Sequence, residues 1–201
     1  MNVRRIENKD FKEVENVIKA YDLARIAHKD QVRASGEPYI IHPINVCINL
    51  AKFHADGATL VAGMLHDVVE DTNYTIEDIE EKFGSEIAKL VLGVTKISNL
   101  HFSSLDEAHD ANIRRIITSL NEDVRIIIIK LCDRLHNMRT LKYLKPERQY
   151  AISKETIDLY APLANRLGLY SVKWELEDLA FKYLYPKEYH ELVEGINKKR
   201  E

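Results

Sequence analysis

The sequence is poor in the residues that make tight turns and covalent crosslinks. Its 201 residues include seven glycines and five prolines, which leaves little room for the many turns of an all-β fold. The two cysteines, Cys47 and Cys132, lie in apolar helical patterns and lack the close spacing of metal-binding thiolates. We therefore expect them to be small core residues in a reducing compartment.

Long apolar runs and a strong excess of one charge are also lacking. No run approaches the roughly 18 apolar residues that cross a bilayer, and the start, MNVRRIENKDF, has no apolar stretch of the kind found in secretory signals. The net charge of −3 gives no general attraction to nucleic acid or to anionic membranes. These absences predict a cytoplasmic protein that binds neither nucleic acid nor membrane directly.

Apolar residues do recur at spacings of three and four over nearly the whole chain, which predicts an all-α fold. The isoleucine run within 124–141 could begin a strand, but the pattern continues well past strand length and favours a buried helix. Thr75 and Gly84 are suited to begin and end a short helix. Other helices are predicted at about 10–31, 43–54, 58–69, 85–95, 107–120, 122–143, 147–160, 163–184 and from Pro186 onward.

The stretch GMLHDVVEDT places one histidine and three carboxylates directly after an apolar run. His66 and Asp67 are adjacent, and Glu70 and Asp71 follow them at a spacing of four, so a continued helix would put the second pair about 5–6 Å from the first. This arrangement suits two metal ligands backed by two acid/base groups. The alternative is the last turn of a helix with solvated carboxylates.

Two further residues favour a metal site. Asp133 lies within an apolar helical pattern, where a carboxylate needs a partner, and an ion pair with a nearby Lys or Arg is the alternative. His42 follows the apolar trio that begins at Tyr39, and it could equally be a core or capping histidine. Together with His66 and Asp67, these residues form a set of two imidazoles and two carboxylates, which suits Mn²⁺, Fe²⁺, Co²⁺ or Zn²⁺. A metal bound there could bring the pKa of water to about 7 and polarise a phosphoryl group.

These residues match the H…HD…D signature of the HD superfamily of metal-dependent phosphohydrolases. The surrounding segments RASGEPYIIHP, GMLHDVVEDT, KLCDRLHNMRTLKYL and YAPLANRLGLYSVKWELEDLAFKYL resemble the hydrolase domain of long RelA/SpoT homologues, which make and degrade (p)ppGpp. The resemblance covers about residues 20–190. It implies an HD-domain helical bundle and a Mn²⁺-dependent reaction that removes the 3′-pyrophosphate of ppGpp or pppGpp, giving GDP or GTP and pyrophosphate.

The resemblance also implies roles for individual residues. The positions that match metal ligands of the family are His42, His66, Asp67 and Asp133. The acidic pair that would orient or activate the attacking water is Glu70 and Asp71. The positions that match nucleotide contacts are Arg33, Ser35, Asn137, Thr140 and Leu144.

One residue departs from the family pattern. The family usually has RKSGEP where this chain has Ala34, so one positive contact near the nucleotide is missing, which lowers the expected affinity but leaves the chemistry. Other cations could serve a polyphosphate, although each also fits an ordinary surface position: Lys96, Arg114, Lys130, Arg134 and Arg139.

The expected organisation is a single hydrolase domain over 1–195. Within it, about 146–195 are C-terminal helices that resemble the segment leading into a synthetase domain, and 196–201 form a charged frayed tail. Two other functions remain open. One is an HD phosphohydrolase acting on another nucleotide, and the other is a regulatory module with a vestigial metal site.

Overall fold

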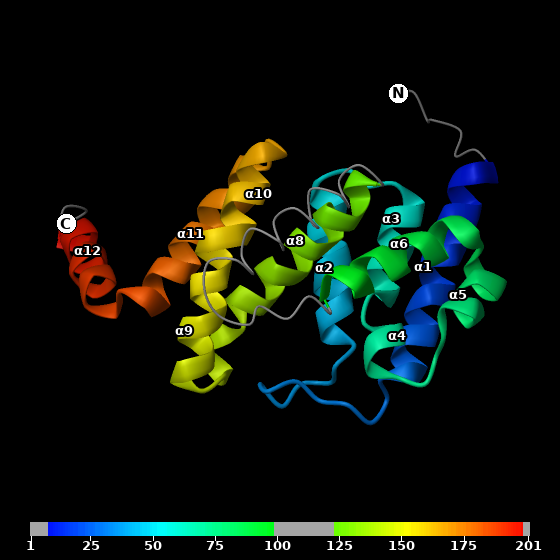
Figure 1. Cartoon of the computed structure of the whole chain (residues 1–201), viewed down its shortest axis with the longest axis horizontal. Coiled ribbons are helices and arrows are strands. Elements are labelled where there is room, and N and C mark those ends of the chain that lie inside the picture. The colour runs from blue at the N-terminus through cyan, green and yellow to red at the C-terminus, as the bar shows by residue number, and fades with distance from the viewer. Residues whose placement is uncertain (1–7, 99–122, 199–201) are drawn as a thin grey trace, which may run out of the picture. The chain divides into compact units, whose positions relative to one another are not determined.

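The computed structural model describes residues 8–98 and 123–198, and within these ranges the chain is built from helices (Figure 1). The only pairing of extended residues found there is an isolated antiparallel bridge between Val32 and Pro38. The all-α prediction is therefore confirmed. The chain divides into two compact units, Met1–Asp133 and Arg134–Glu201.

The first unit is organised around an apolar helix, α3 (Gly57–Leu65), most of whose residues are buried. The other helices described in this unit are α1 (Asn8–Ala27), α2 (Ile41–Lys52), α4 (Val68–Asp71), α5 (Ile76–Phe83), α6 (Ser85–Ser98) and the first part of α8 (Val124–Arg139). Helix α3 packs against α1, α2 and α6, while α4 and α5 contact α6. The segment that directly follows α3 therefore begins in the interior of the first unit.

Gly63 allows α2 and α3 to pack closely. A methyl group at this position would overlap the side chain of Leu50 in α2 and would lie 3.7 Å from Val46 and 3.8 Å from Cys47. A larger residue would therefore have to displace the buried side chain of Leu50. The approach matters for the candidate site, because α2 carries His42 and α3 leads directly into His66.

Replacing Gly63 by alanine should destabilise the protein. Overpacking a buried site costs about 1–3 kcal/mol, which exceeds the roughly 1 kcal/mol that alanine gains in helix propensity. Equilibrium urea unfolding measures the difference. Gly195→Ala is the matched control, because no atom lies within 4 Å of its added methyl group, and it should be neutral or stabilising. A Gly63→Ala variant as stable as the wild type would contradict the close approach.

Two predicted helix ends are confirmed, and one predicted start is displaced. Thr75 and Asp78 form a reciprocal capping box at the start of α5. Gly84 follows the end of α5 with a φ of +91°, a conformation that favours glycine. Helix α2 begins at Ile41 rather than at the predicted Pro43. Proline is tolerated there because the N–H groups of the first turn have no partner within the helix.

Helix α8 runs without interruption from Val124 to Arg139, so the isoleucine run is helical, as predicted. Ile126, Ile127 and Ile129 are buried. The helix predicted over 107–120 lies outside the described residues. Among the helices that are described, none has the length and apolarity needed to cross a membrane.

The second unit is built on α11 (Tyr170–Leu184). Its other helical elements, beyond the end of α8, are η1 (Leu141–Tyr143), α9 (Pro146–Glu155), the π-helix η2 (Thr156–Tyr160), α10 (Ala161–Arg166) and α12 (Pro186–Lys198). Helix α11 packs against α9, η2, α10 and α12. The helix predicted over 163–184 is therefore two helices, separated at 167–169, whereas α12 begins at Pro186 as predicted.

Candidate metal centre

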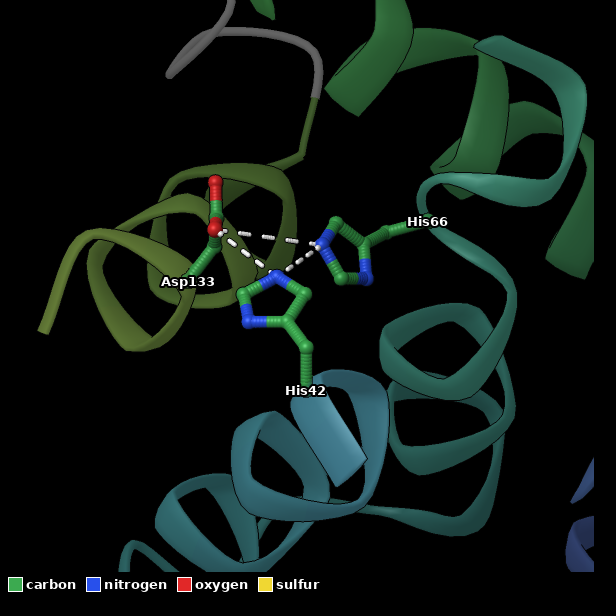
Figure 2. Close-up of side chains that lie close together, drawn as sticks. All are labelled: His42, His66 and Asp133. Carbon is green, nitrogen blue, oxygen red and sulfur yellow. Dashed lines mark hydrogen bonds and ion pairs between the residues drawn. The ribbon is translucent and has the colours of Figure 1, made fainter. Parts of the chain in front are cut away.

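Three side chains from separate parts of the first unit converge on one point, as Figure 2 shows. His42 lies in the first turn of α2, His66 directly follows α3, and Asp133 lies in α8. Nε2 of His42 is 3.3 Å from Nε2 of His66 and 3.2 Å from Oδ1 of Asp133. All three residues are buried, and one ligand atom from each lies within 4.8 Å of the others. This spacing suits a single metal ion held by all three.

A backbone contact fixes which nitrogen of His66 faces the centre. Nδ1 of His66 lies 2.9 Å from the carbonyl oxygen of Gly63. A carbonyl only accepts hydrogen bonds, so Nδ1 carries a proton, and Nε2 is directed at the centre. Nε2 of His42 faces it at 3.3 Å. Two imidazole nitrogens at this distance need a proton or a metal ion between them, so the donor set fits a bound cation.

Asp67 also lies in this group, but its backbone conformation differs from the one that the sequence predicted. Its Oδ2 lies 3.1 Å from Nε2 of His66 and 3.4 Å from Nε2 of His42. The helix predicted over 58–69 breaks at His66 and Asp67, and the short helix α4 follows. The spacing of four nevertheless survives, because the backbone N–H of Asp71 donates to the carbonyl of Asp67 at 2.9 Å. All four predicted metal ligands therefore lie together.

Lys130 holds one oxygen of Asp133. Its ammonium group donates to Oδ2 of Asp133 at 2.7 Å and to the hydroxyl of Ser98 at 2.8 Å. The lysine side chain is only 12% exposed, so it is not a surface cation. Oδ1 of Asp133 faces His42. Both interpretations of Asp133 are therefore compatible, since one oxygen pairs with lysine while the other faces the histidines.

Burial and charge oppose each other in this centre. Burial lowers the pKa of His42. Burial also acts against the charged form of His66, but the negative charges of Asp67 and Asp133 outweigh it and raise the pKa of His66 to about 9. Burial alone would raise the carboxyl pKa values. The two histidines nevertheless lower the pKa of Asp67. Lys130 and the two histidines lower the pKa of Asp133. Both carboxylates therefore stay ionised, as metal ligands must.

The predicted acidic pair lies on α4, and its two members differ in environment. Burial raises the pKa of Glu70; Lys130 opposes this rise, and the negative charges of Asp67 and Asp71 add to it. Both residues are exposed, and the carboxylate of Asp71 accepts a hydrogen bond from the hydroxyl of Tyr39 at 3.1 Å. A carboxyl group with a raised pKa beside a buried polar centre is typical of acid/base sites.

Tyr39 is the residue that sequence reasoning missed. Its hydroxyl also donates to Oδ2 of Asp67 at 2.7 Å. In the sequence it appeared only as the first member of an apolar trio, and the available signal was its position three residues before His42. A loop has no periodic pattern from which the direction of a side chain could be predicted. The contact therefore depends on the tertiary fold.

The predicted nucleotide contacts divide between the two units. Arg33 and Ser35 lie in the loop between α1 and α2. The guanidinium of Arg33 lies 5.6 Å from the ring centre of Tyr39, and the hydroxyl of Ser35 donates to Glu37 at 3.0 Å. This loop therefore meets the candidate site through Tyr39.

The remaining predicted contacts, Asn137, Thr140 and Leu144, belong to the second unit, and their role as nucleotide contacts stays a prediction. The hydroxyl of Thr140 donates to the carbonyl of His136 at 3.1 Å. Among the candidate cations, Lys96 is exposed and Arg114 lies outside the described residues. The others form ion pairs, which are Lys130 with Asp133, Arg134 with Glu155 and Arg139 with Glu175.

Known proteins share this sequence pattern. The HD domain family matches residues 20–170 of the chain. The chain is 53% identical over 181 residues to a Synechocystis protein named probable guanosine-3′,5′-bis(diphosphate) 3′-pyrophosphohydrolase, covering 90% of this chain and 23% of that protein. It is 46% identical over 188 residues to the bifunctional (p)ppGpp synthase/hydrolase SpoT of Escherichia coli K12, covering 94% and 27% of the two chains.

A solved structure agrees with these relatives. It is a metazoan orthologue of SpoT, described as hydrolysing ppGpp and playing a role in starvation responses; the TM-score is 0.62 at 27% identity, covering 83% of this chain and 94% of that one. The chain spans about a quarter of the length of the curated relatives it matches. The family match includes the three residues drawn in Figure 2 and their neighbour Asp67. The chain therefore belongs to the HD domain family.

Proposed function

We propose that this chain is a metal-dependent hydrolase that removes the 3′-pyrophosphate of ppGpp or pppGpp, giving GDP or GTP and pyrophosphate. The observation that carries the proposal is the buried grouping of His42, His66 and Asp133, with Asp67 in contact with both histidines. The names of the relatives support the same reaction. Such a hydrolysis needs a metal site and groups that transfer protons. The buried imidazoles and carboxylates suit the first role, and the acidic pair beside them suits the second.

The proposed ligands are His42, His66, Asp67 and Asp133, and the proposed ion is Mn²⁺. Nitrogen and carboxylate donors without a thiolate suit Mn²⁺ among several divalent ions. When bound, the ion would supply Lewis acidity for a phosphoryl oxygen and for water. Lys130 assists by holding Oδ2 of Asp133, which keeps Oδ1 directed at His42.

The acidic pair handles the protons. Water forms a bond to the phosphorus attached to the 3′-oxygen, and the bond between that phosphorus and the 3′-oxygen breaks. The attacking water gives a proton to a carboxylate, and the resulting carboxyl group then passes that proton to the departing 3′-oxygen. Glu70 suits the acceptor role, because its raised pKa makes it a stronger base than an ordinary glutamate. Asp71, held by Tyr39, would orient the water.

The test is pyrophosphate release from ppGpp by the purified chain, with Mn²⁺ and with a chelator. We expect Mn²⁺-dependent release of pyrophosphate and GDP, with no orthophosphate. A panel of divalent ions added to the metal-free protein would identify the preferred one. No release from a protein shown to bind metal would contradict the proposed substrate.

Another nucleotide is the second candidate substrate, because Ala34 stands where the family usually has a lysine. Orthophosphate release from a nucleoside monophosphate would identify this alternative. A chain that stays metal-free when Mn²⁺ is added would instead support the regulatory module. The ionised carboxylates of Asp67 and Asp133 favour a functional metal site over a vestigial one.

We expect turnover to fall at low pH with a midpoint above the ordinary glutamate value of 4.5. Burial favours the protonated form of Glu70, and a protonated carboxyl cannot accept a proton, so acidification through the raised pKa removes the base. The pH dependence of kcat at saturating metal measures this midpoint. In Glu70→Gln, the turnover that remains should no longer show this fall at low pH. A midpoint at or below 4.5 would contradict the assigned role.

Several wider features are also part of the proposal. Arg33, Ser35, Asn137, Thr140 and Leu144 are proposed nucleotide contacts. In a longer protein like the relatives, the helices of 146–195 would lead into a synthetase domain, as the name of SpoT suggests. The cytoplasmic location and the absence of direct nucleic-acid binding stay predictions from composition.

A further inference from the structure

The hydroxyl of Tyr39 is shared by two carboxylates of the candidate site. It lies 2.7 Å from Oδ2 of Asp67 and 3.1 Å from Oδ2 of Asp71. A hydroxyl carries a single proton, so one donor serves both acceptors. One of these carboxylates is a proposed metal ligand and the other belongs to the proposed acid/base pair. The hydroxyl therefore ties the two groups at a fixed separation.

The backbone of Asp71 is held as well. Its N–H donates to the carbonyl of Asp67 at 2.9 Å, and its carbonyl accepts from the side-chain amide of Gln31 at 2.8 Å. Helix α4 has only four residues and would not be stable alone. Asp71 is its last residue, so the contacts with Gln31 and Tyr39, which come from outside the helix, help to determine where its carboxylate lies.

Tyr39 and Gln31 are in turn fixed to each other through His28. The His28 ring stacks on the Tyr39 ring with centres 4.6 Å apart, and its Nδ1 lies 2.7 Å from Oε1 of Gln31. The backbone N–H of Tyr39 donates to the carbonyl of Gln31 at 3.1 Å. His28, Gln31, Asp71 and Tyr39 therefore form a closed ring of contacts, which we term the Asp71 clamp.

We propose that Tyr39 is a positioning residue that, within the Asp71 clamp, holds the carboxylate of Asp71 in register with the metal ligand Asp67. This inference rests on the proposed metal-dependent hydrolysis. The clamp acts through Asp71 and does not bind the nucleotide. Its loss should therefore lower kcat at saturating Mn²⁺ and leave KM nearly unchanged. If Tyr39 only anchored its loop, its loss would instead change substrate binding or the stability of the fold.

Tyr39→Phe tests the proposal, because it keeps the stacked ring and removes only the hydroxyl. Partners of this kind typically contribute 10–100-fold to activity or metal affinity. We expect kcat at saturating Mn²⁺ to fall about 10–100-fold, with KM within about threefold of wild type. Tyr74→Phe is the matched control in the same unit and should retain full activity. An unchanged kcat, or a kcat restored by excess Mn²⁺, would overturn the proposal.

Gln31→Met tests the second contact that the ring makes with Asp71. It removes the amide that holds the Asp71 carbonyl, and we expect a smaller loss of kcat. Because both residues act on Asp71, the Tyr39→Phe/Gln31→Met double variant should lose clearly less than the product of the two single losses. Fully multiplicative losses would show that the two residues act separately and would contradict the clamp.

Amide hydrogen exchange supplies a readout that does not depend on turnover. The N–H of Asp71 should exchange faster in both variants, while amides of α5 stay unchanged. Unchanged exchange of the Asp71 amide in both variants would overturn the clamp even if the wild type is active. Wild-type protein that releases no pyrophosphate would overturn the proposed function but not the clamp, so the two failures are distinguishable.

Discussion

Asp67→Ala should lose bound metal and activity together. Oδ2 of Asp67 contacts both His66 and His42, so its removal takes a negative charge and a ligand atom from the centre. Even partners one step behind a ligand typically contribute 10–100-fold to metal affinity, so we expect Mn²⁺ affinity to fall by at least about 100-fold. Calorimetric titration of the metal-free protein measures this loss, and pyrophosphate release from ppGpp measures the activity.

Folding must be separated from metal loss in this variant. Asp22→Ala is the matched control, because Asp22 is an exposed aspartate of the same unit with a loose contact to Arg25. It should bind metal and turn over ppGpp like the wild type. Thermal unfolding of both variants in chelator would show whether the metal-free fold is intact. An Asp67→Ala protein that folds and binds Mn²⁺ with unchanged affinity would contradict the ligand role of Asp67.

Glu70→Gln should keep the metal and lose most turnover. The substitution preserves the shape of the side chain but removes its ability to accept a proton, and a positioned general base contributes roughly 10²–10⁴-fold. Glu70 belongs to α4, outside the group of residues that contact the two histidines. We therefore expect kcat to fall by about 10²–10⁴, with Mn²⁺ affinity close to that of wild type.

The matched control is Glu77→Gln, an exposed glutamate in the first turn of α5. It should leave both kcat and metal affinity unchanged. Single-turnover measurements on Glu70→Gln would separate the chemical step from product release. Near-full activity of Glu70→Gln would show that the acidic pair does not activate water, and the proton acceptor would have to be sought elsewhere.

Local rules of helix chemistry explain why much of this fold was predictable. Apolar spacing identified the helices, and its length decided that the isoleucine run in α8 is not a strand. Thr75 and Gly84 marked the two ends of α5 because capping depends on neighbouring residues only. The break of the helix at His66 and Asp67 was not predictable, because no glycine or proline marks it.

The sequence by itself determined the all-α class and the chemical types of the site residues, because helical periodicity and side-chain chemistry are properties of short segments. Only the tertiary structure decided that Asp133 meets His42 and His66, since distances between helices depend on packing such as that of α3 against α2. Packing also turned Lys130 inward and Tyr39 toward two carboxylates. The directions of such side chains follow from contacts between segments far apart in the chain, which a local pattern does not contain.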